Sequence, residues 1–184
     1  EMLEGIVEGS KRIESLVGQL RDFVRQEPTK LVQRVNMNQV VESAIDLLGP
    51  LVRRAAKGFE RLLANELPPA RGGRHQLEQV VMNLLSNACQ AVEKSQGNVE
   101  VATGQRGEEV FVSIRDDGPG IPAANLERVK DPFFTTKRAH GGTGLGLSVS
   151  ARVVERHSGR LTFESEEGVG TTATVWLPFD GAVE

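Results

Sequence analysis

Two asparagines, Asn83 and Asn87, have the residue type and the spacing to bind a metal ion or a phosphate. A helix over residues 79–91, at about 100° per residue, places both on one polar arc with nearby glutamines, beside a wide apolar arc. Surface helices usually carry Lys and Glu there, whereas uncharged amides can bind a hard cation through oxygen and donate N–H groups to phosphate. Taken alone, the pattern also fits amides that only cap or solvate the edge of a helix.

A carboxylate followed by a Gly-x-Gly turn stands directly after a predicted strand, in the sequence DDGPGI at residues 116–121. This order places a hydrogen-bond acceptor beside backbone that a flat ring can approach closely. By itself, DGPG is equally consistent with a calcium-binding turn or a simple turn.

A second glycine segment, GGTGLGL at residues 141–147, opens a predicted helix at 148–157. Such a segment presents backbone N–H groups and the positive end of the helix dipole to phosphates. It does not fit a dinucleotide-binding fingerprint or a P-loop, because the preceding strand, the following acidic residue and the Lys-Ser/Thr pair are missing. Between the two glycine segments, DPFFTTK at 131–137 predicts a hinge anchored by buried aromatic rings, from which Lys137 can reach a phosphate.

The elements that position these motifs alternate between helices and strands. One predicted helix is capped by Asn36 or Asn38 and ended by Gly58, and the amide-bearing helix follows and ends near Gly97. Residues 67–73, rich in Pro and Gly, predict a loop. Strands are predicted at 31–35, 59–64, 99–103, 110–115, 161–164 and 172–177.

The N-terminal residues are predicted to form a separate amphipathic helix with an a/d heptad. Its seam residues are Leu3, Ile6, Ser10, Ile13, Val17, Leu20 and Val24. Three glycines weaken this helix by about 1 kcal/mol each relative to Ala, so it is expected to need a partner. The alternative is that it folds back on its own domain.

The composition limits the functional classes. The 184 residues suit one domain with an appendage, and a net charge of −3 without any basic-aromatic patch predicts no nucleic-acid partner. A lone cysteine, Cys89, favours a reducing, cytoplasmic compartment. No apolar run approaches ~20 residues, so no membrane contact is expected, and no signal peptide is evident. Because position 1 is not Met, we expect a fragment of a longer protein, which leaves room for a membrane anchor upstream.

In their order, NLLSNA, DDGPGI, DPFFTTK and GTGLGL resemble the ATP-binding catalytic domain of sensor histidine kinases in two-component systems, most closely the nitrogen-regulator type. The resemblance covers residues 31–179 and places the chain among the Bergerat-fold (GHKL) ATPases. It implies an α+β fold: a two-layer α/β sandwich with a mixed, mainly antiparallel sheet and helices on one face, preceded by one long amphipathic helix. Residues 1–27 then resemble the second helix of the dimerisation and phosphotransfer hairpin, and residues 28–184 form the catalytic domain.

The resemblance also implies a role for each site residue. Asn87 is expected to bind the Mg²⁺ that bridges the phosphates of ATP, Asn83 to support the phosphate end, and Asp116 to accept a hydrogen bond from the adenine amino group. A lid over about 129–142 carries Lys137. The other expected nucleotide-binding residues are Gly118, Gly120 and Thr171 near the base, and Gly142, Thr143, Gly144, Leu145 and Gly146 around the phosphates.

Asn83 also bears on the reaction. Hydrolytic relatives carry a water-activating Glu four residues before the metal-binding Asn, and the amide of Asn83 cannot act as that base. Transfer to a histidine is therefore expected, with Asn83 and Lys137 as catalytic residues. None of His75, His140 and His157 lies on the heptad helix, so the acceptor is expected on a helix absent from this chain. The implied partners are ATP or ADP, that helix, a response-regulator receiver domain and a second copy of the full-length kinase. A nucleotide-sensing domain without transfer activity is the alternative, and a hydrolytic ATPase is disfavoured.

Overall fold

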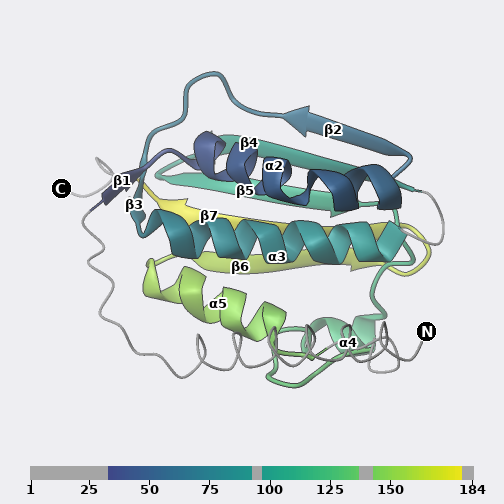
Figure 1. Cartoon of the computed structure of the whole chain (residues 1–184). Coiled ribbons are helices and arrows are strands. Elements are labelled where there is room, and N and C mark those ends of the chain that lie inside the picture. The colour runs from purple at the N-terminus through teal and green to yellow at the C-terminus, as the bar shows by residue number, and fades with distance from the viewer. Residues whose placement is uncertain (1–32, 93–96, 137–142, 180–184) are drawn as a thin grey trace, which may run out of the picture.

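The computed structural model describes residues 33–92, 97–136 and 143–179 (Figure 1). The predicted N-terminal helix, Lys137, His140 and Gly142 lie outside these ranges. The helices are α2 (Met37–Ala55), α3 (Arg74–Val92), α4 (Ala123–Leu126) and α5 (Gly146–Arg156). The strands are β1 (Gln33–Val35), β2 (Gly58–Leu62), β3 (Ala70–Gly72), β4 (Asn98–Arg106), β5 (Glu109–Asp116), β6 (Arg160–Glu166) and β7 (Gly170–Pro178). Within these ranges no helix is long and apolar enough to cross a bilayer.

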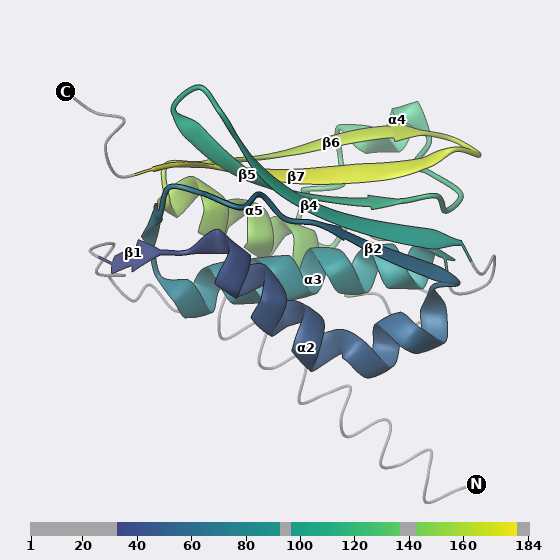
Figure 2. The same ribbon diagram turned by 90° about the horizontal axis from the view of Figure 1, so that it is seen from above.

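The main sheet has five strands in the order β2-β4-β5-β7-β6. Only the β2–β4 pair is parallel, and the other three pairs are antiparallel. Helices α2, α3 and α5 cover one face of this sheet (Figure 2). The predicted α+β sandwich, with a mixed and mainly antiparallel sheet, is therefore confirmed.

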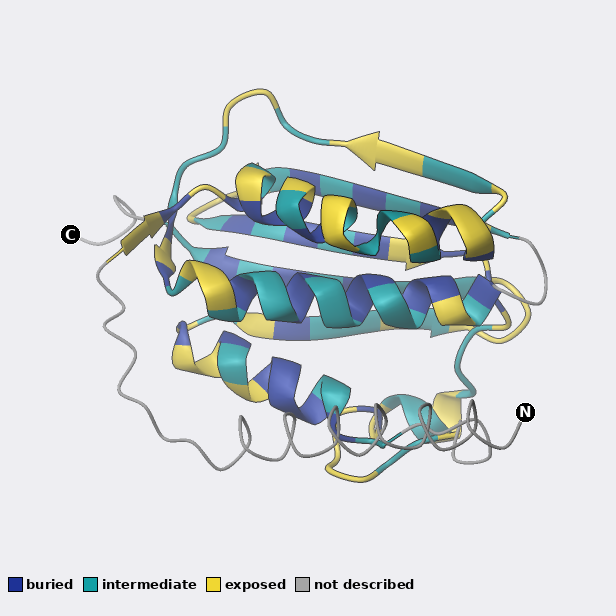
Figure 3. Cartoon of the chain, viewed as in Figure 1, coloured by how far each residue is buried: buried dark blue, intermediate teal, exposed yellow. Residues whose placement is uncertain are grey.

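The core lies between this sheet and the helices, and each element contributes its apolar side (Figure 3). In β5, side chains alternate between the buried, helix-covered face and the opposite face, as period-2 alternation requires. In α3 the predicted apolar arc is buried, including Leu85 at 0% exposure. Asn36 rather than Asn38 caps α2, because its side-chain oxygen accepts the backbone N–H groups of Asn38 and Gln39 at 3.0 and 3.3 Å.

Two expectations about boundaries were wrong. The predicted loop at 67–73 contains β3, which pairs antiparallel with β1. This strand has no local signal, because three residues between Pro and Gly form it only by pairing with a distant segment. Helix α2 ends at Ala55, and Gly58 instead begins β2, where a Cβ would lie 2.4 Å from the Asn98 side-chain oxygen.

His157 connects the end of α5 to the start of α3, and it is only 2% exposed. Its Nδ1 donates to the Val153 carbonyl at 2.7 Å, which leaves Nε2 to accept the Gly73 N–H at 3.0 Å. His157 thus binds one of the last carbonyls of α5, as a histidine at a helix C-terminus can. Gly72 packs so closely here that a Cβ would lie 2.3 Å from the imidazole Cδ2.

We expect this histidine to make folding stability depend on pH. Burial lowers the pKa of His157 below its usual 6.5, although the hydrogen bond to Val153 partly opposes this shift. As the pH falls, His157 is therefore protonated in the unfolded chain before it is protonated in the folded one. The contribution of neutral His157 to folding stability is complete above pH 6.5, and it is lost as the pH falls through the lower pKa of the folded state. Urea unfolding at pH 8 and pH 5.5 measures the effect.

The matched variants are His157→Gln and His75→Gln. His157→Gln should reduce the loss of stability between pH 8 and pH 5.5. It should also cost about 1–3 kcal/mol at pH 8, because the partly buried Gly73 N–H loses its well-aligned acceptor. The His75 side chain is 97% exposed, so its replacement should leave both quantities unchanged. An undiminished pH dependence in His157→Gln would show that other groups cause it.

Candidate functional site

The polar arc of α3 contacts the first turns of α5. The Asn83 Nδ2 donates to the Ser150 hydroxyl at 2.9 Å. At Gly146, the first residue of α5, a Cβ would lie 2.5 Å from the Asn83 side-chain oxygen. Glycine at this position therefore lets the start of α5 lie directly against Asn83. Asn87, half-buried, follows one turn later on the same side of α3.

The segment before α5, from Thr143 to Leu145, contacts neighbouring backbone closely. The Thr143 hydroxyl accepts the Leu145 N–H at 3.2 Å, and Leu145, the N-cap residue of α5, has no capping side chain. Gly144 has φ +68°, and a Cβ there would meet the Phe133 backbone at 2.4 Å. This open, glycine-rich helix start has the form of an anion-binding N-terminus.

The two phenylalanines after Pro132 are held differently from the prediction. Phe133 is 60% exposed, so its ring is not the buried anchor that was expected. Its backbone N–H donates instead to the Gly144 carbonyl at 2.9 Å, and it adopts a φ of +65°. Phe134 is half-buried, and the Arg128 guanidinium lies 4.7 Å from its ring centroid. A backbone contact, which sequence patterns do not reveal, ties this segment to the glycine loop.

Asp116 ends β5 and is 6% exposed. Its Oδ1 accepts the Gly118 N–H at 3.0 Å, which fixes the turn that follows. In the ladder Asp116 stands opposite Thr171 of β7, so both side chains lie on the helix-covered face. The ladder thus brings together Asp116 and Thr171, two predicted site residues that are far apart in the sequence.

Gly118 and Gly120 allow the turn after β5 to pack closely on two sides. A Cβ at Gly118 would lie 2.9 Å from the Ala91 Cβ at the end of α3. Gly120 has φ +69°, and a Cβ there would lie 2.0 Å from the Glu166 carbonyl oxygen. Both positions therefore require glycine for close approach, and Gly120 also for its left-handed backbone.

Helix α3 connects the two glycine segments. Gly146 packs on Asn83 near its middle, Gly118 packs on Ala91 near its end, and Asn87 lies between them. Eight residues of helix separate the two contacts by about 12 Å. Both motifs therefore border one strip of α3, and Asn87 is at its centre.

The donor set suits Mg²⁺ bound together with phosphates. Mg²⁺ in proteins is often bound by one or two side-chain oxygens, with waters and substrate phosphates completing its shell, and the amide of Asn87 can supply such an oxygen. Among the described residues no group of three His, Cys, Asp or Glu side chains could hold a metal. Asp117 is instead bonded to Asn98, at 2.6 Å to its N–H and 2.7 Å to its Nδ2, so the calcium-turn alternative has no support.

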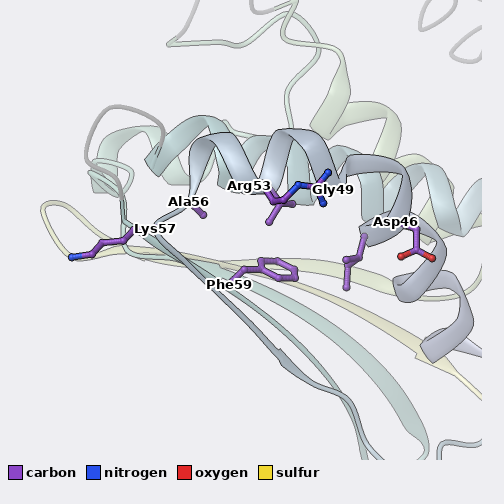
Figure 4. A pocket seen from close by; sticks show the side chains of 8 residues that line it. Asp46, Gly49, Arg53, Ala56, Lys57 and Phe59 are labelled. Carbon is purple, nitrogen blue, oxygen red and sulfur yellow. The ribbon is translucent and has the colours of Figure 1, made fainter.

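A cavity of about 420 Å³ lies elsewhere, between α2 and β2. Phe59, Arg53 and Gly49 line it, with Asp46 and Lys57 at opposite ends (Figure 4). None of its lining residues belongs to the glycine segments or to α3. Since its charged groups do not converge, we do not assign it a ligand.

Known proteins resemble this chain in sequence and in structure. Residues 72–181 match the family model described as histidine kinase-, DNA gyrase B-, and HSP90-like ATPase. The signal transduction histidine-protein kinase AtoS of Escherichia coli (strain K12) is 35% identical over 98% of this chain. The sensor histidine kinase ZraS of the same strain is 35% identical over 97%. The solved catalytic domain of histidine kinase ThkA is 29% identical, with a TM-score of 0.70 over 80% of this chain and 95% of that one.

The chain spans only part of its curated relatives: 29% of the length of AtoS and 37% of that of ZraS. The similarity to sensor kinases extends over nearly the whole of this chain, whereas the family model covers only the part from Gly72, the last residue of β3, to residue 181. The nitrogen-regulator subtype stays a prediction.

Proposed function

Because the chain belongs to the histidine kinase-, DNA gyrase B- and HSP90-like ATPase family and carries a catalytic domain of the sensor histidine kinase type, we propose that it binds Mg-ATP and transfers the γ-phosphoryl group to a histidine. The observation that carries the proposal is the strip of α3 between Asn83 and Ala91, which both glycine segments border. One helix thereby spans from a base-binding end at Asp116 to a phosphate-binding end at Gly146.

In this proposal each part of the site has one task. Asp116 and Thr171 bind the amino edge of adenine, while Gly118 and Gly120 let the base lie against the backbone. The N–H groups at the start of α5, with Gly142, Thr143, Gly144, Leu145 and Gly146, hold the phosphates. Asn87 supplies the oxygen ligand for Mg²⁺, which when bound neutralises phosphate charge, and Lys137 adds a positive charge at the γ-phosphate.

Asn83 favours transfer over hydrolysis. Its amide cannot take a proton from water near neutral pH, and its Nδ2 donates a hydrogen bond to the Ser150 hydroxyl. A neutral imidazole needs no such base to attack phosphorus. The acceptor therefore supplies the nucleophile, and the chain supplies positioning and charge stabilisation.

A labelling experiment tests the transfer. The chain is mixed with [γ-³²P]ATP, Mg²⁺ and a second protein that carries a phosphotransfer helix with its histidine. We expect acid-labile label on that protein, and none when its histidine is replaced by Gln. ATP binding without labelling would favour the nucleotide-sensing alternative, and steady phosphate release without an acceptor would favour a hydrolase.

We extend the proposal to the partners that a sensor kinase needs. These are a receiver domain that takes the phosphoryl group from the histidine, and a second copy of the full-length kinase. We place the catalytic domain in the cytoplasm, where ATP and a receiver domain are available. Size measurement of the full-length protein and phosphotransfer to purified receiver domains test these partners directly.

A further inference from the structure

Ser165 of β6 forms a row with two residues of the base-binding end. In the ladder Ser165 stands opposite Thr171, and Thr171 stands opposite Asp116, so the three side chains cross β6, β7 and β5 on the helix-covered face. The β6–β7 turn and the connection that follows β5 lie at the same end of the sheet (Figure 1).

The Ser165 hydroxyl makes three hydrogen bonds there. It lies 2.8 Å from the Ile121 N–H, 2.8 Å from the Gly170 carbonyl oxygen and 2.9 Å from the Thr171 hydroxyl. The Ile121 bond ties the turn after β5 to the β6–β7 hairpin. The Gly168 N–H, which donates to the Pro119 carbonyl at 2.8 Å, reinforces the same contact.

Counting protons assigns a direction to each bond. A serine hydroxyl has one proton and two lone pairs. The Gly170 carbonyl can only accept, so the single proton of Ser165 goes to it. Ser165 must then accept both from the Ile121 N–H and from the Thr171 hydroxyl. The proton of Thr171 is therefore directed at Ser165, and the Thr171 oxygen can only accept from a third group.

We propose, on the basis of the function proposed above, that Ser165 is a positioning residue that selects an amino-bearing base. Ser165 orients the hydroxyl of Thr171 so that the base-binding end presents two acceptors side by side. These acceptors are the Thr171 hydroxyl oxygen and the Asp116 carboxylate. The amino group of adenine donates to such acceptors, whereas the O6 of guanine is an acceptor and is repelled. Ser165 also holds Ile121, and with it the glycines against which the base lies.

Calorimetric titration with ADP, GDP and tripolyphosphate, each with Mg²⁺, tests this role. Ser165→Ala should weaken ADP binding roughly tenfold, narrow the preference for ADP over GDP and leave tripolyphosphate binding unchanged. Ser165→Thr keeps the hydroxyl and should restore the preference. Ser113→Ala is the matched control, since Ser113 lies on the opposite face of β5 between the buried Val112 and Ile114.

Thr171→Val provides a second route if Ser165→Ala does not fold. It should narrow the preference for ADP over GDP similarly. The double variant should lose no more of this preference than either single one, because Ser165 selects the base through the Thr171 hydroxyl. A wild-type preference in Ser165→Ala, or equal losses for ADP and tripolyphosphate, would overturn the inference. A wild-type chain that binds tripolyphosphate but neither nucleotide would overturn adenine recognition itself. A wild-type chain that binds none of the three ligands would overturn the proposed function.

Discussion

Asp116→Asn is expected to weaken ADP binding by about 30- to 150-fold, the largest effect of a single substitution in the nucleotide site. The change removes the charged acceptor that we propose for the adenine amino group and presents an amide in its place. A hydrogen bond to a charged group contributes about 1.5–3 kcal/mol. The upper part of this range, about 2–3 kcal/mol, corresponds to that loss of affinity and is expected because Asp116 is buried. Titration calorimetry with ADP and Mg²⁺ measures it.

Two controls separate this effect from damage to the turn. Asparagine keeps an oxygen for the Gly118 N–H, so the turn itself should persist in Asp116→Asn. Asp117→Asn changes the neighbouring carboxylate, which is exposed and bonded to Asn98, and should leave ADP binding nearly unchanged. If both variants bind ADP like the wild type, the base-binding end has been assigned to the wrong residues.

Asn87→Asp tests the other end of the same strip of α3. The new carboxylate adds negative charge where the phosphates are expected, so the affinity for ATP should fall. The dependence of this affinity on the Mg²⁺ concentration should also differ from that of the wild type. Ser86→Asp adds the same charge to the preceding residue of α3, about 100° away around the helix, and is its matched control. Equal effects of the two variants would mean that general charge, not a ligand position, is responsible.

Gly120→Ala is expected to destabilise the fold by about 3 kcal/mol or more. Its φ of +69° costs an alanine roughly 1–2 kcal/mol, and the new Cβ would stand 2.0 Å from the Glu166 carbonyl oxygen. Neither partner of that contact is a flexible side chain, so the turn and the β6–β7 hairpin must move apart. Urea unfolding followed by the fluorescence of Trp176, the only tryptophan, measures the loss.

Gly107→Ala is the matched control for Gly120→Ala. Gly107 has a similar φ of +60°, but its Cβ would meet nothing within 4 Å. This variant should therefore cost only the roughly 1–2 kcal/mol of the left-handed backbone. The difference between the two variants isolates the close approach at Gly120. Equal costs would contradict the packing of hairpin and turn on which the role of Ser165 also depends.

The local elements were largely predictable from sequence. Periodicity places the buried arc of α3, and alternation places β4 to β7, because both patterns follow from the geometry of a single element. β3 could not be predicted, since three residues become a strand only through β1. The exposure of Phe133 was also missed, because its backbone bond to Gly144 leaves no trace in the residue pattern.

Ser165 carried no signal of its own. A serine in a strand near a Gly-rich turn is common, and its three hydrogen bonds appear only when β6, β7 and the turn after β5 are assembled. Its six-residue distance from Thr171 becomes a cross-strand pair because of the hairpin register. Neighbours in register on a ladder are thus where further site residues can be found.

The two asparagines show how the information is divided. Sequence alone determined that Asn83 and Asn87 share one side of a helix, because this depends only on residue type and helical spacing. The resemblance to the kinase family added the prediction that an amide stands where hydrolytic relatives carry a glutamate. Only the tertiary structure decided that Asn83 binds Ser150, 67 residues away, and that both glycine segments border the same strip of α3. Contacts between distant segments depend on how helices pack on the sheet, and that packing is set by the whole core.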